Sequence, residues 1–505
     1  MMTSQVIVKV LGLFYKLYVT NRSGFGDEGN AIANAGFQVY ALVLSFTSMG
    51  IPGAISKIIA EKLSIGDNRG ANKVLKISLI IFSSIGLLGS YILFCLAGTI
   101  AENYLHIKET RLSIIALCPS VFFVSITAVL KGYFSGRESL KITAKAQGID
   151  QFVNTFSTIA LIELNIFITR KINTERMAAI SNLAMTLGNL MELIFLLFEL
   201  RKTLPEIREE VLSSVEIENT RIITILKEIL VVSLPITLTS IIMSISKNID
   251  SATVVKSLSS KIGYDEAKRQ YGIIIGKVDP LINLPLSFNM AIIAALLPSI
   301  SGTKNNIEKM NKRINSAFFI GMTIVLPVTC VYFFYSKEVL NLLFPNASAG
   351  ENLLKISSLS IIFITIEQIN NTIFEGLEKP WVPIISIFTG VIAKAILNSI
   401  LVPKTDFALG GAIGACVSTF ACHIVASAIS TFELIKMRKI KLKISTFLKP
   451  AFASIIFLLT TKLMQDIILK NFQGRISFVI TLVISMSAYI ILLIKIAKIN
   501  NEFQN

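Results

Sequence analysis

The sequence predicts an all-α polytopic membrane protein with about fourteen transmembrane helices. About fourteen long apolar segments follow one another along its 505 residues, and a helix needs roughly 20 apolar residues to cross a bilayer. Hydrophobic residues make up 53% of the chain and charged residues only 16%, with a mean hydropathy of +0.69. A soluble protein of this length carries more charge on its surface, and no loop here is long enough to form a soluble domain.

Each expected span is an apolar run separated from the next by polar residues. The first run lacks a small-residue cleavage site, so we expect a membrane helix there rather than a cleaved signal peptide. The expected spans, in chain order, are residues 4–20, 31–55, 76–99, 111–134, 146–168, 177–200, 222–247, 271–299, 314–336, 352–374, 380–402, 408–435, 450–469 and 476–496.

Basic residues gather in the loops that follow the second, fourth, eighth and twelfth spans. These loops all fall on one side of the membrane, and the positive-inside rule makes that side cytoplasmic, with both termini on it. The loop at 256–269 breaks the pattern, because it falls on the outer side yet carries four basic residues and two acidic ones. The basic residues of the cytoplasmic loops are Lys57, Lys62, Arg69, Lys73 and Lys76; Lys131, Arg137, Lys141 and Lys145; Lys304, Lys309, Lys312 and Arg313; and Lys436, Arg438, Lys439, Lys441, Lys443 and Lys449.

The longest polar interruption is residues 201–221, which are mixed in charge and have no apolar face long enough to span. This segment separates six expected spans from the next six, as a two-lobed transporter requires, because one lobe must rock against the other. We therefore expect an N-terminal lobe at 1–200, a cytoplasmic linker at 201–221, a C-terminal lobe at 222–435 and two further helices at 436–505.

Composition and motifs argue against several other classes of protein. The net charge is +16, but the basic residues lie in short loops, where anionic lipid explains them better than nucleic acid does. The five cysteines are scattered in apolar stretches without a Cys-x-x-Cys pair, so we interpret them as small hydrophobic residues. The sequence has no Walker A, His-Glu-x-x-His or Gly-x-Ser-x-Gly motif. We therefore expect no catalytic residue, metal or cofactor, and transport driven by an ion gradient, the membrane potential or the substrate's own gradient.

Lys9 and Lys16 lie inside the first apolar span. They are seven residues apart, hence on one face of a helix and about 10 Å apart along its axis. A lysine at mid-membrane depth costs about 2.5–3.5 kcal/mol, so such residues usually line a polar pathway. Lys9 fits either a cavity or the cytoplasmic interface, whereas the depth of Lys16 favours a cavity. Arg22 marks the outer end of the span, as a cavity residue or as an interfacial anchor.

The eighth span combines charge with proline. Lys277, Asp279, Pro280, Asn283 and Pro285 fall within nine residues. Prolines free backbone carbonyls, which membrane helices tolerate where water or protein satisfies them. We therefore expect a broken helix that lines a water-filled cavity; the alternative is an internal Lys277–Asp279 ion pair near the outer interface.

The tenth to twelfth spans contribute further polar residues. Lys394 and Asn398 are four residues apart on one face of the eleventh span, and Thr419 with Ser418 is available from the twelfth. The tenth span carries a polar stripe that faces the cavity or approaches the cytoplasmic surface. The stripe consists of Glu367, Gln368, Asn370, Asn371 and Glu375.

Four segments resemble a known family along the whole chain and in order. They are GLFYKLYVTNRSGFGDEGN (12–30), GIPGAISKIIAEKLSIGDNRGANKVLK (50–76), YGIIIGKVDPLINLP (271–285) and FEGLEKPWVPI (374–384). Together they resemble the stage V sporulation protein B branch of the polysaccharide-biosynthesis transporters, which is related to lipid II flippases and, more distantly, to multidrug and toxin exporters. The resemblance implies two six-helix lobes around a central cationic cavity, plus two C-terminal helices that form a lipid-facing groove.

The resemblance also implies roles for particular residues. Lys9 and Lys16 match basic residues that flippases place in the first helix, although lipid II flippases use arginine there. Lys57 falls in the segment that ends the second helix. Asp279 matches an acidic position of the eighth helix, but Pro280 stands where those flippases carry an arginine. Lys277 would supply that charge, without the two-pronged hydrogen bonding of a guanidinium.

Some flippases bind sodium in the second lobe, through an aspartate of the seventh helix and polar groups of the eleventh and twelfth. Asp250, Asn398 and Thr419 fit that set of ligands. Lys394 occupies a further ligand position, where its ammonium would replace the ion. We therefore expect no sodium site.

The function that the resemblance implies is the flipping of an undecaprenyl-pyrophosphate-linked saccharide, similar to lipid II, to the outer leaflet by alternating access. Its pyrophosphate would contact a substrate-binding set formed by Lys9, Lys16, Arg22, Lys57, Lys277 and Asp279. Expected partners are this lipid-linked saccharide, membrane lipids and cell-wall synthesis proteins, in a bacterial plasma membrane. The alternatives are a cation-coupled drug or metabolite exporter of the same fold and a non-transporting scaffold of cell-wall synthesis.

Overall fold

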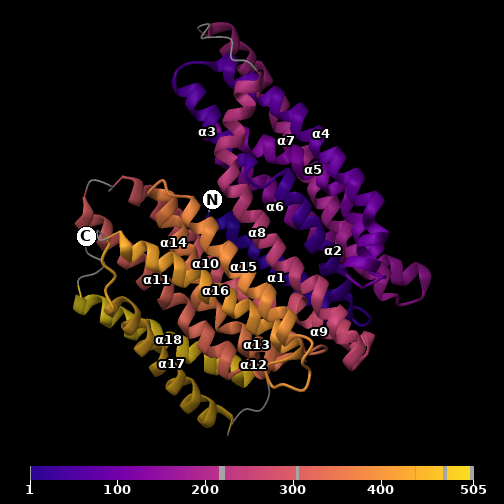
Figure 1. The fold of residues 1–505 in the computed structure, drawn as a ribbon, viewed down its shortest axis with the longest axis vertical. Helices are drawn as coiled ribbons and strands as arrows, with labels where there is room; N and C mark the ends of the chain where they lie inside the picture. Colours follow the sequence, from indigo (N-terminus) through magenta and orange to yellow (C-terminus); the bar gives the residue numbers. More distant parts are fainter. Residues whose placement is uncertain (1, 215–221, 303–305, 438–439, 470–474, 501–505) are drawn as a thin grey trace. The chain divides into compact units, whose positions relative to one another are not determined.

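The computed structural model describes residues 2–214, 222–302, 306–437, 440–469 and 475–500. Within these ranges the side chains of residues 2–7, 9, 213, 290–295, 297–299, 301, 468–469 and 494–500 lie outside the description. The regular structure of the described part is helical throughout (Figure 1). The chain divides into two compact units, Met1–Gly272 and Ile273–Asn505.

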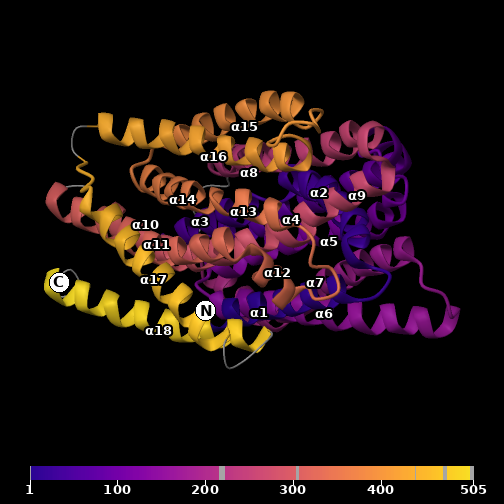
Figure 2. The same cartoon turned by 90° about the horizontal axis from the view of Figure 1, so that it is seen from below.

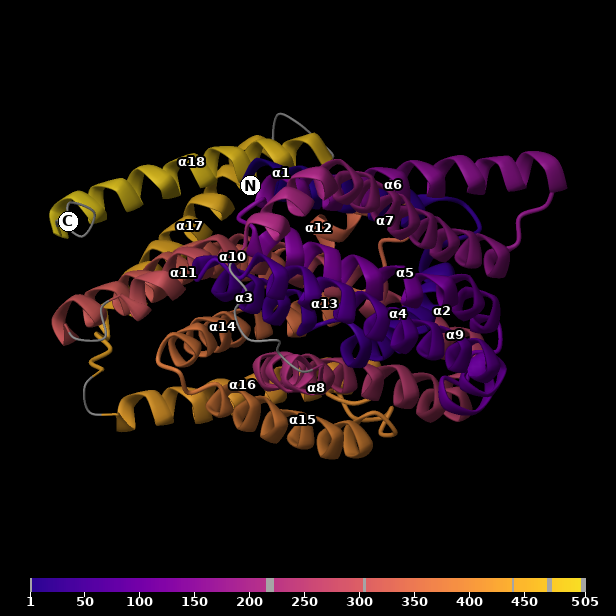
Figure 3. The same ribbon diagram turned by 90° about the horizontal axis from the view of Figure 1, so that it is seen from above.

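The described residues of the first unit form nine α-helices and one π-helical turn. Their bounds are α1 (Met2–Asn21), α2 (Gly26–Thr47), α3 (Ile51–Ser64), α4 (Asn68–Thr99), the π-turn η1 (Ile100–Tyr104), α5 (Thr110–Gly136), α6 (Leu140–Thr169), α7 (Thr174–Ser213), α8 (Ile222–Ile262) and α9 (Tyr264–Ile273), whose last residue lies past the unit boundary. Figure 3 shows α6 and α7 running along each other, and these two helices are in contact.

The second unit contains the other π-turn and nine further α-helices. They are η2 (Ile274–Val278), α10 (Asp279–Ser301), α11 (Ile307–Phe334), α12 (Ser336–Leu343), α13 (Glu351–Ser358), α14 (Ser360–Gly376), α15 (Trp381–Leu401), α16 (Gly411–Lys436), α17 (Ser445–Leu469) and α18 (Arg475–Asn500). Figure 2 shows α17 and α18, in yellow, beside α11. The Tyr489 hydroxyl of α18 donates to the Thr323 carbonyl of α11 at 2.8 Å.

Twelve helical stretches among the described residues are long and apolar enough to cross a membrane. The chain is therefore an all-helical, multi-pass membrane protein, as predicted. One stretch, Gly26–Ser64, joins α2 and α3. The first and eighth expected spans are also helical, as α1 and as α9 to α10, but are not among the twelve. Helix α4 exposes Leu87, Leu88 and Tyr91, which is favourable where lipid rather than water covers them.

Close packing in the first unit depends on small residues of α5. A side chain on Gly132 would meet the Pro52 carbonyl oxygen at 2.9 Å, and one on Gly136 would meet that of Ser56 at 2.7 Å. Glycines four residues apart let two membrane helices approach at backbone distance. This approach buries an apolar cluster that includes Ile55 of α3.

In the second unit, glycines likewise allow α15 and α16 to pack closely. A side chain on Gly390 would meet the Cys422 carbonyl oxygen at 2.5 Å, and one on Gly414 would meet the Leu401 side chain at 2.8 Å. These contacts set an antiparallel register. In that register Lys394 of α15 lies level with the Ser418–Thr419 turn of α16.

The eighth expected span does not break, which corrects that prediction. Its helix continues from α9 into α10 through η2, where the Asp279 amide donates to the Ile274 carbonyl five residues earlier. A π-turn widens the helix locally. Pro280 lacks an amide hydrogen, and the wider turn rearranges the hydrogen bonding immediately before it without ending the helix.

The segment expected to link the lobes begins as helix. Residues 201–213 continue α7, and the Arg137 guanidinium pairs with the Glu210 carboxylate at 2.8 Å. Residues 215–221 lie outside the described residues. The linker role and the lobe boundaries stay predictions.

Candidate functional site

Lys16 is directed toward α2 within the first unit. Its ammonium donates to the Asn30 side-chain oxygen at 2.8 Å, and the Asn30 amide nitrogen donates to the Thr20 hydroxyl at 3.0 Å. Asn30 and Thr20 are buried, whereas Lys16 is half-buried. The Asn30 amide is neutral, so this contact does not itself neutralise the positive charge of Lys16. The Lys9 side chain lies outside the described part.

Arg22, the residue that follows α1, pairs with a carboxylate of α6. Its guanidinium contacts the Glu163 carboxylate at 2.7 and 2.8 Å, and the Tyr18 hydroxyl also donates to that carboxylate. Charge-assisted bonds in this two-pronged geometry are strong and directional. Arg22 therefore ties the end of α1 to α6, a role that the sequence did not indicate because Glu163 lies 141 residues away.

The remaining predicted substrate-binding residues have different surroundings. Lys57 is exposed on α3 and lies 3.8 Å from Glu61. Lys277 is fully buried in η2, where its ammonium donates to the Ala347 and Ala349 carbonyls at 2.6 and 2.7 Å. Asp279, the first residue of α10, is half-buried. The contacts of Lys277 hold the loop before α13 in place, and its role toward a substrate stays a prediction.

The four residues predicted for the cavity or ion coupling divide between the units. Asp250 is half-buried on α8 of the first unit. Lys394 and Asn398 are fully buried on α15 of the second unit. Thr419 is half-buried on α16, level with Lys394. The second unit by itself therefore brings Lys394 and Thr419 to one level.

A charged network on α9 pairs two of the four basic residues in the loop that broke the positive-inside pattern. The buried Lys268 ammonium lies 2.5 Å from Glu28, 3.0 Å from Glu109 and 3.7 Å from Asp265. Arg269 contacts Glu266 at 3.0 Å. Neighbouring carboxylates thus offset these basic charges, so they do not act as a positive loop.

Burial lowers the pKa of Lys268, but hydrogen bonds to Glu28 and Glu109 outweigh this effect, so its pKa is raised. Burial likewise raises the pKa of Glu109, but hydrogen bonds from Tyr264 and Lys268 outweigh that effect and lower it. Both groups are therefore stabilised in their charged forms. The acidic partners Glu28 and Glu109 lie 240 and 159 residues from Lys268, which is why sequence spacing did not reveal them.

Two buried acid–base contacts were also missed. Lys131 of α5 contacts Glu192 of α7 at 2.7 Å. His423 of α16 contacts Glu367 of α14 through Nδ1 at 2.8 Å. Glu367 belongs to the predicted polar stripe, and the available signal was an ionisable residue inside an apolar span.

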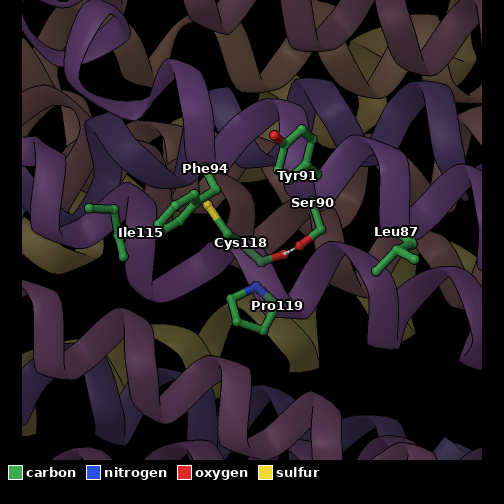
Figure 4. A pocket seen from close by; sticks show the side chains of 7 residues that line it. All are labelled: Leu87, Ser90, Tyr91, Phe94, Ile115, Cys118 and Pro119. Carbon is green, nitrogen blue, oxygen red and sulfur yellow. Dashed lines mark hydrogen bonds between the residues drawn. The ribbon is translucent and has the colours of Figure 1, made fainter.

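An apolar pocket of about 330 Å³ lies between α4 and α5 (Figure 4). The Ser90 hydroxyl donates to the Cys118 carbonyl at 2.7 Å beside Pro119, and Tyr91 and Phe94 line the same pocket. No lining residue is charged, so the pocket suits a hydrocarbon chain rather than a phosphate. Across the described residues, no group of three or more His, Cys, Asp or Glu side chains is arranged to hold a metal ion.

Two curated proteins of Bacillus subtilis (strain 168) are similar to the chain along most of its length. Stage V sporulation protein B is 23% identical over 452 residues, which cover 88% of this chain and 83% of that protein. Lipid II flippase MurJ is 24% identical over 451 residues, which cover 85% of this chain and 80% of that protein.

Two solved structures share the fold. Lipid II flippase MurJ in an inward closed conformation aligns with a TM-score of 0.73 at 17% identity, covering 98% of each chain. An inward-facing multidrug resistance MATE family transporter of the MOP superfamily aligns with a TM-score of 0.67 at 17% identity, covering 86% of this chain and 96% of that one. Identities this low show the fold alone.

The family assignment rests on a separate match. Residues 1–304 match the family described as "Polysaccharide biosynthesis protein". This match covers more than half of the 505 residues and agrees with the resemblance drawn from the four sequence segments. The chain belongs to the polysaccharide biosynthesis protein family.

Proposed function

We propose that this protein is a transporter that moves a polyprenyl-pyrophosphate-linked saccharide from the cytoplasmic to the outer leaflet of the bacterial plasma membrane by alternating access. The main support for this proposal is Lys16, a cationic side chain within the first apolar span that contacts the neutral amide of Asn30. A cation placed there suits an anionic pyrophosphate. The relatives named for lipid II flipping and for sporulation support this substrate class.

In this proposal about fourteen helices cross the membrane and both termini face the cytoplasm. Lys16 forms the centre of the pyrophosphate site, with Lys9, Arg22, Lys57, Lys277 and Asp279 as further members. The polyprenyl chain stays in the lipid beside α17 and α18, where Phe452, Leu459 and Leu463 of α17 are exposed. Exposed apolar side chains of this kind are compatible with a hydrocarbon chain.

The membrane potential favours outward movement of an anion. With the inside negative, each charge gains about 2.3 kcal/mol per 100 mV. We propose no sodium requirement, because Lys394 stands at a position where sodium-binding flippases carry a ligand. Replacing sodium by potassium in the assay buffer should then leave the rate unchanged.

The test is lipid II binding by native mass spectrometry, with lipid II flipping in proteoliposomes as a second readout. Lys16→Ala should lose most lipid II binding, because it removes a charge-assisted contact worth about 1.5–3 kcal/mol, or roughly ten- to hundred-fold in affinity. Lys202→Ala is the matched control, since Lys202 is an exposed lysine beside Glu199. Equal binding by Lys16→Ala and wild type would reject Lys16 as the pyrophosphate site.

A drug or metabolite exporter of the same fold is the second candidate, favoured by the alignment with the multidrug transporter. Such a protein binds cations and needs an acidic, aromatic cavity, which the lysines of α1 do not provide. Selective binding of cationic drugs, with no binding of lipid II, would support the exporter over the flippase. If the protein shows neither activity, the remaining candidate is a non-transporting scaffold of cell-wall synthesis.

A further inference from the structure

Helices α14 and α16 of the second unit bring two ionisable side chains together inside the bundle. The His423 ring contacts the Glu367 carboxylate through Nδ1 at 2.8 Å, and their side chains are only 9% and 7% exposed. Both residues lie near the middle of their helices, and both helices belong to candidate membrane spans. A contact between neutral side chains would join the two helices at a smaller desolvation cost than this ionisable pair does.

Polar contacts continue along α14 on both sides of this pair. The Asn289 amide nitrogen of α10 donates to the Thr365 hydroxyl at 3.0 Å. The Asn370 amide nitrogen donates to the Ser430 hydroxyl of α16 at 2.9 Å. The pair is therefore one part of a polar line that runs through an otherwise apolar helix bundle.

The charge of the pair depends on one proton. With a neutral ring, Nδ1–H donates to the carboxylate and the pair has a net charge of −1. With one more proton, on Nε2, an imidazolium faces a carboxylate and the net charge is zero. The two states therefore differ by one unit of charge, buried between α14 and α16.

The other charged groups on these elements set the electrostatic environment. On α15, Lys394 places a positive charge level with Thr419, one turn from His423. On α14, Glu375 lies two turns beyond Glu367. The remaining charged residues of the elements packed on α14 and α16 lie toward helix ends: Asp279 on α10, Glu308, Lys309, Lys312 and Arg313 on α11, Glu351 and Lys355 on α13, and Glu433 and Lys436 on α16.

We propose that Glu367 and His423 form a proton-binding site that is loaded and unloaded once per conformational cycle, so that transport is coupled to a proton. This inference rests on the proposed transporter function and extends it by naming the ion and the residues that bind it. Lys394 assists release of the proton through its positive charge. If the pair served only to join α14 to α16, the same contact would persist without a change in protonation.

The first test measures proton binding without transport. The purified full-length protein is melted at pH values between about 5.5 and 8.5, a range that brackets the ordinary titration of histidine. His423→Asn places an amide where Nδ1 lies and retains a donor to Glu367, but it does not titrate. His106→Asn is the matched control, because His106 is the only other histidine and asparagine tolerates its positive φ of 54°.

We expect the melting temperature of the wild type and of His106→Asn to change with pH in the range in which the pair exchanges its proton. His423→Asn should lose the part of this pH dependence that the pair contributes. A His423→Asn profile that keeps the wild-type slope would overturn the proposal. Glu367→Gln, which retains hydrogen bonding but cannot form the ion pair, gives an independent second variant with the same expectation.

The second test uses proteoliposomes that contain lipid II and an internal pH dye. In the pH range where protonation of one site limits transport, the wild-type flipping rate should change about tenfold per pH unit, as the occupancy of that site does. Flipping by the wild type should also move protons across the membrane. His423→Asn should flip at a rate that does not vary with pH and should move none. Proton-independent flipping by wild type would overturn the coupling. A wild type that flips no lipid II, yet shows the histidine-dependent melting profile, would refute the proposed substrate and retain the proton site.

Discussion

Two buried lysines nine residues apart are held in opposite ways. Lys268, 2% exposed in the first unit, lies among the carboxylates of Glu28, Glu109 and Asp265. Lys277, fully buried in the second unit, donates to the carbonyls of Ala347 and Ala349. The contacts of Lys268 are with carboxylates, whereas these two contacts of Lys277 are with uncharged carbonyls. Burial of a lysine in this family member therefore does not by itself identify a binding site for an anion.

The largest effect is expected from Lys277→Met. The side chain keeps its length, but two carbonyls of the loop before α13 lose a charged donor, at a cost of about 3–6 kcal/mol if each contact is worth 1.5–3. A stability measurement by thermal unfolding in detergent checks this expectation. A loss below about 1 kcal/mol, which is typical of surface contacts, would show that the ammonium is not what holds this loop.

Lys268→Met should cost less, about 1–3 kcal/mol, because its partners are partly exposed and water rehydrates them. Glu28 and Glu109 have side chains that are 49% and 30% exposed. High salt should reduce the difference between variant and wild type, since screening weakens charge pairs. Lys268→Arg is the matched control and should recover most of the stability; an identical loss in both variants would indicate packing rather than charge.

The smallest effect concerns the pH range in which α9 stays in contact with its neighbours. The lowered pKa of Glu109 stabilises the folded state above its ordinary value of about 4.3, and this stability is lost as pH falls through the lowered value. The raised pKa of Lys268 stabilises the folded state below a pH of about 10.4, and this stability is lost as pH rises through the raised value. Hydrogen exchange of residues 264–272 should be slow between these limits and accelerate outside them. A profile that Lys268→Met leaves unchanged would contradict this assignment.

The fold class followed from sequence because apolar length is a local property. Each span is readable from about 20 consecutive residues, and helices cover the predicted segments. The family was also readable, since the four quoted segments agree with the family match over residues 1–304. Helix ends were less accurate: α7 extends to Ser213, and the predicted break near Pro280 is a continuous helix with a π-turn.

The contacts of the candidate site were beyond the sequence because they join residues far apart along the chain. Arg22 and Glu163, or Lys268 and Glu28, are brought together by helix packing, which no local pattern encodes. Lys16 lies on α1, but its contact with Asn30 of α2 was not predicted. His423 lies in no motif of the sequence, and its contact with Glu367 joins two different helices.

The π-turn η2 has a consequence for how this chain is compared with its relatives. A hydrogen bond that skips five residues instead of four accommodates one residue more than a regular helix would. Deleting one residue between Ile274 and Val278 would restore the α-helical pattern and leave the later side chains of α10 on their present faces, whereas a deletion from a regular helix would rotate them by about 100°. A relative that lacks the turn should therefore align with a one-residue gap here. An alignment without that gap would match the later residues of α10 to residues on a different face of the relative's helix.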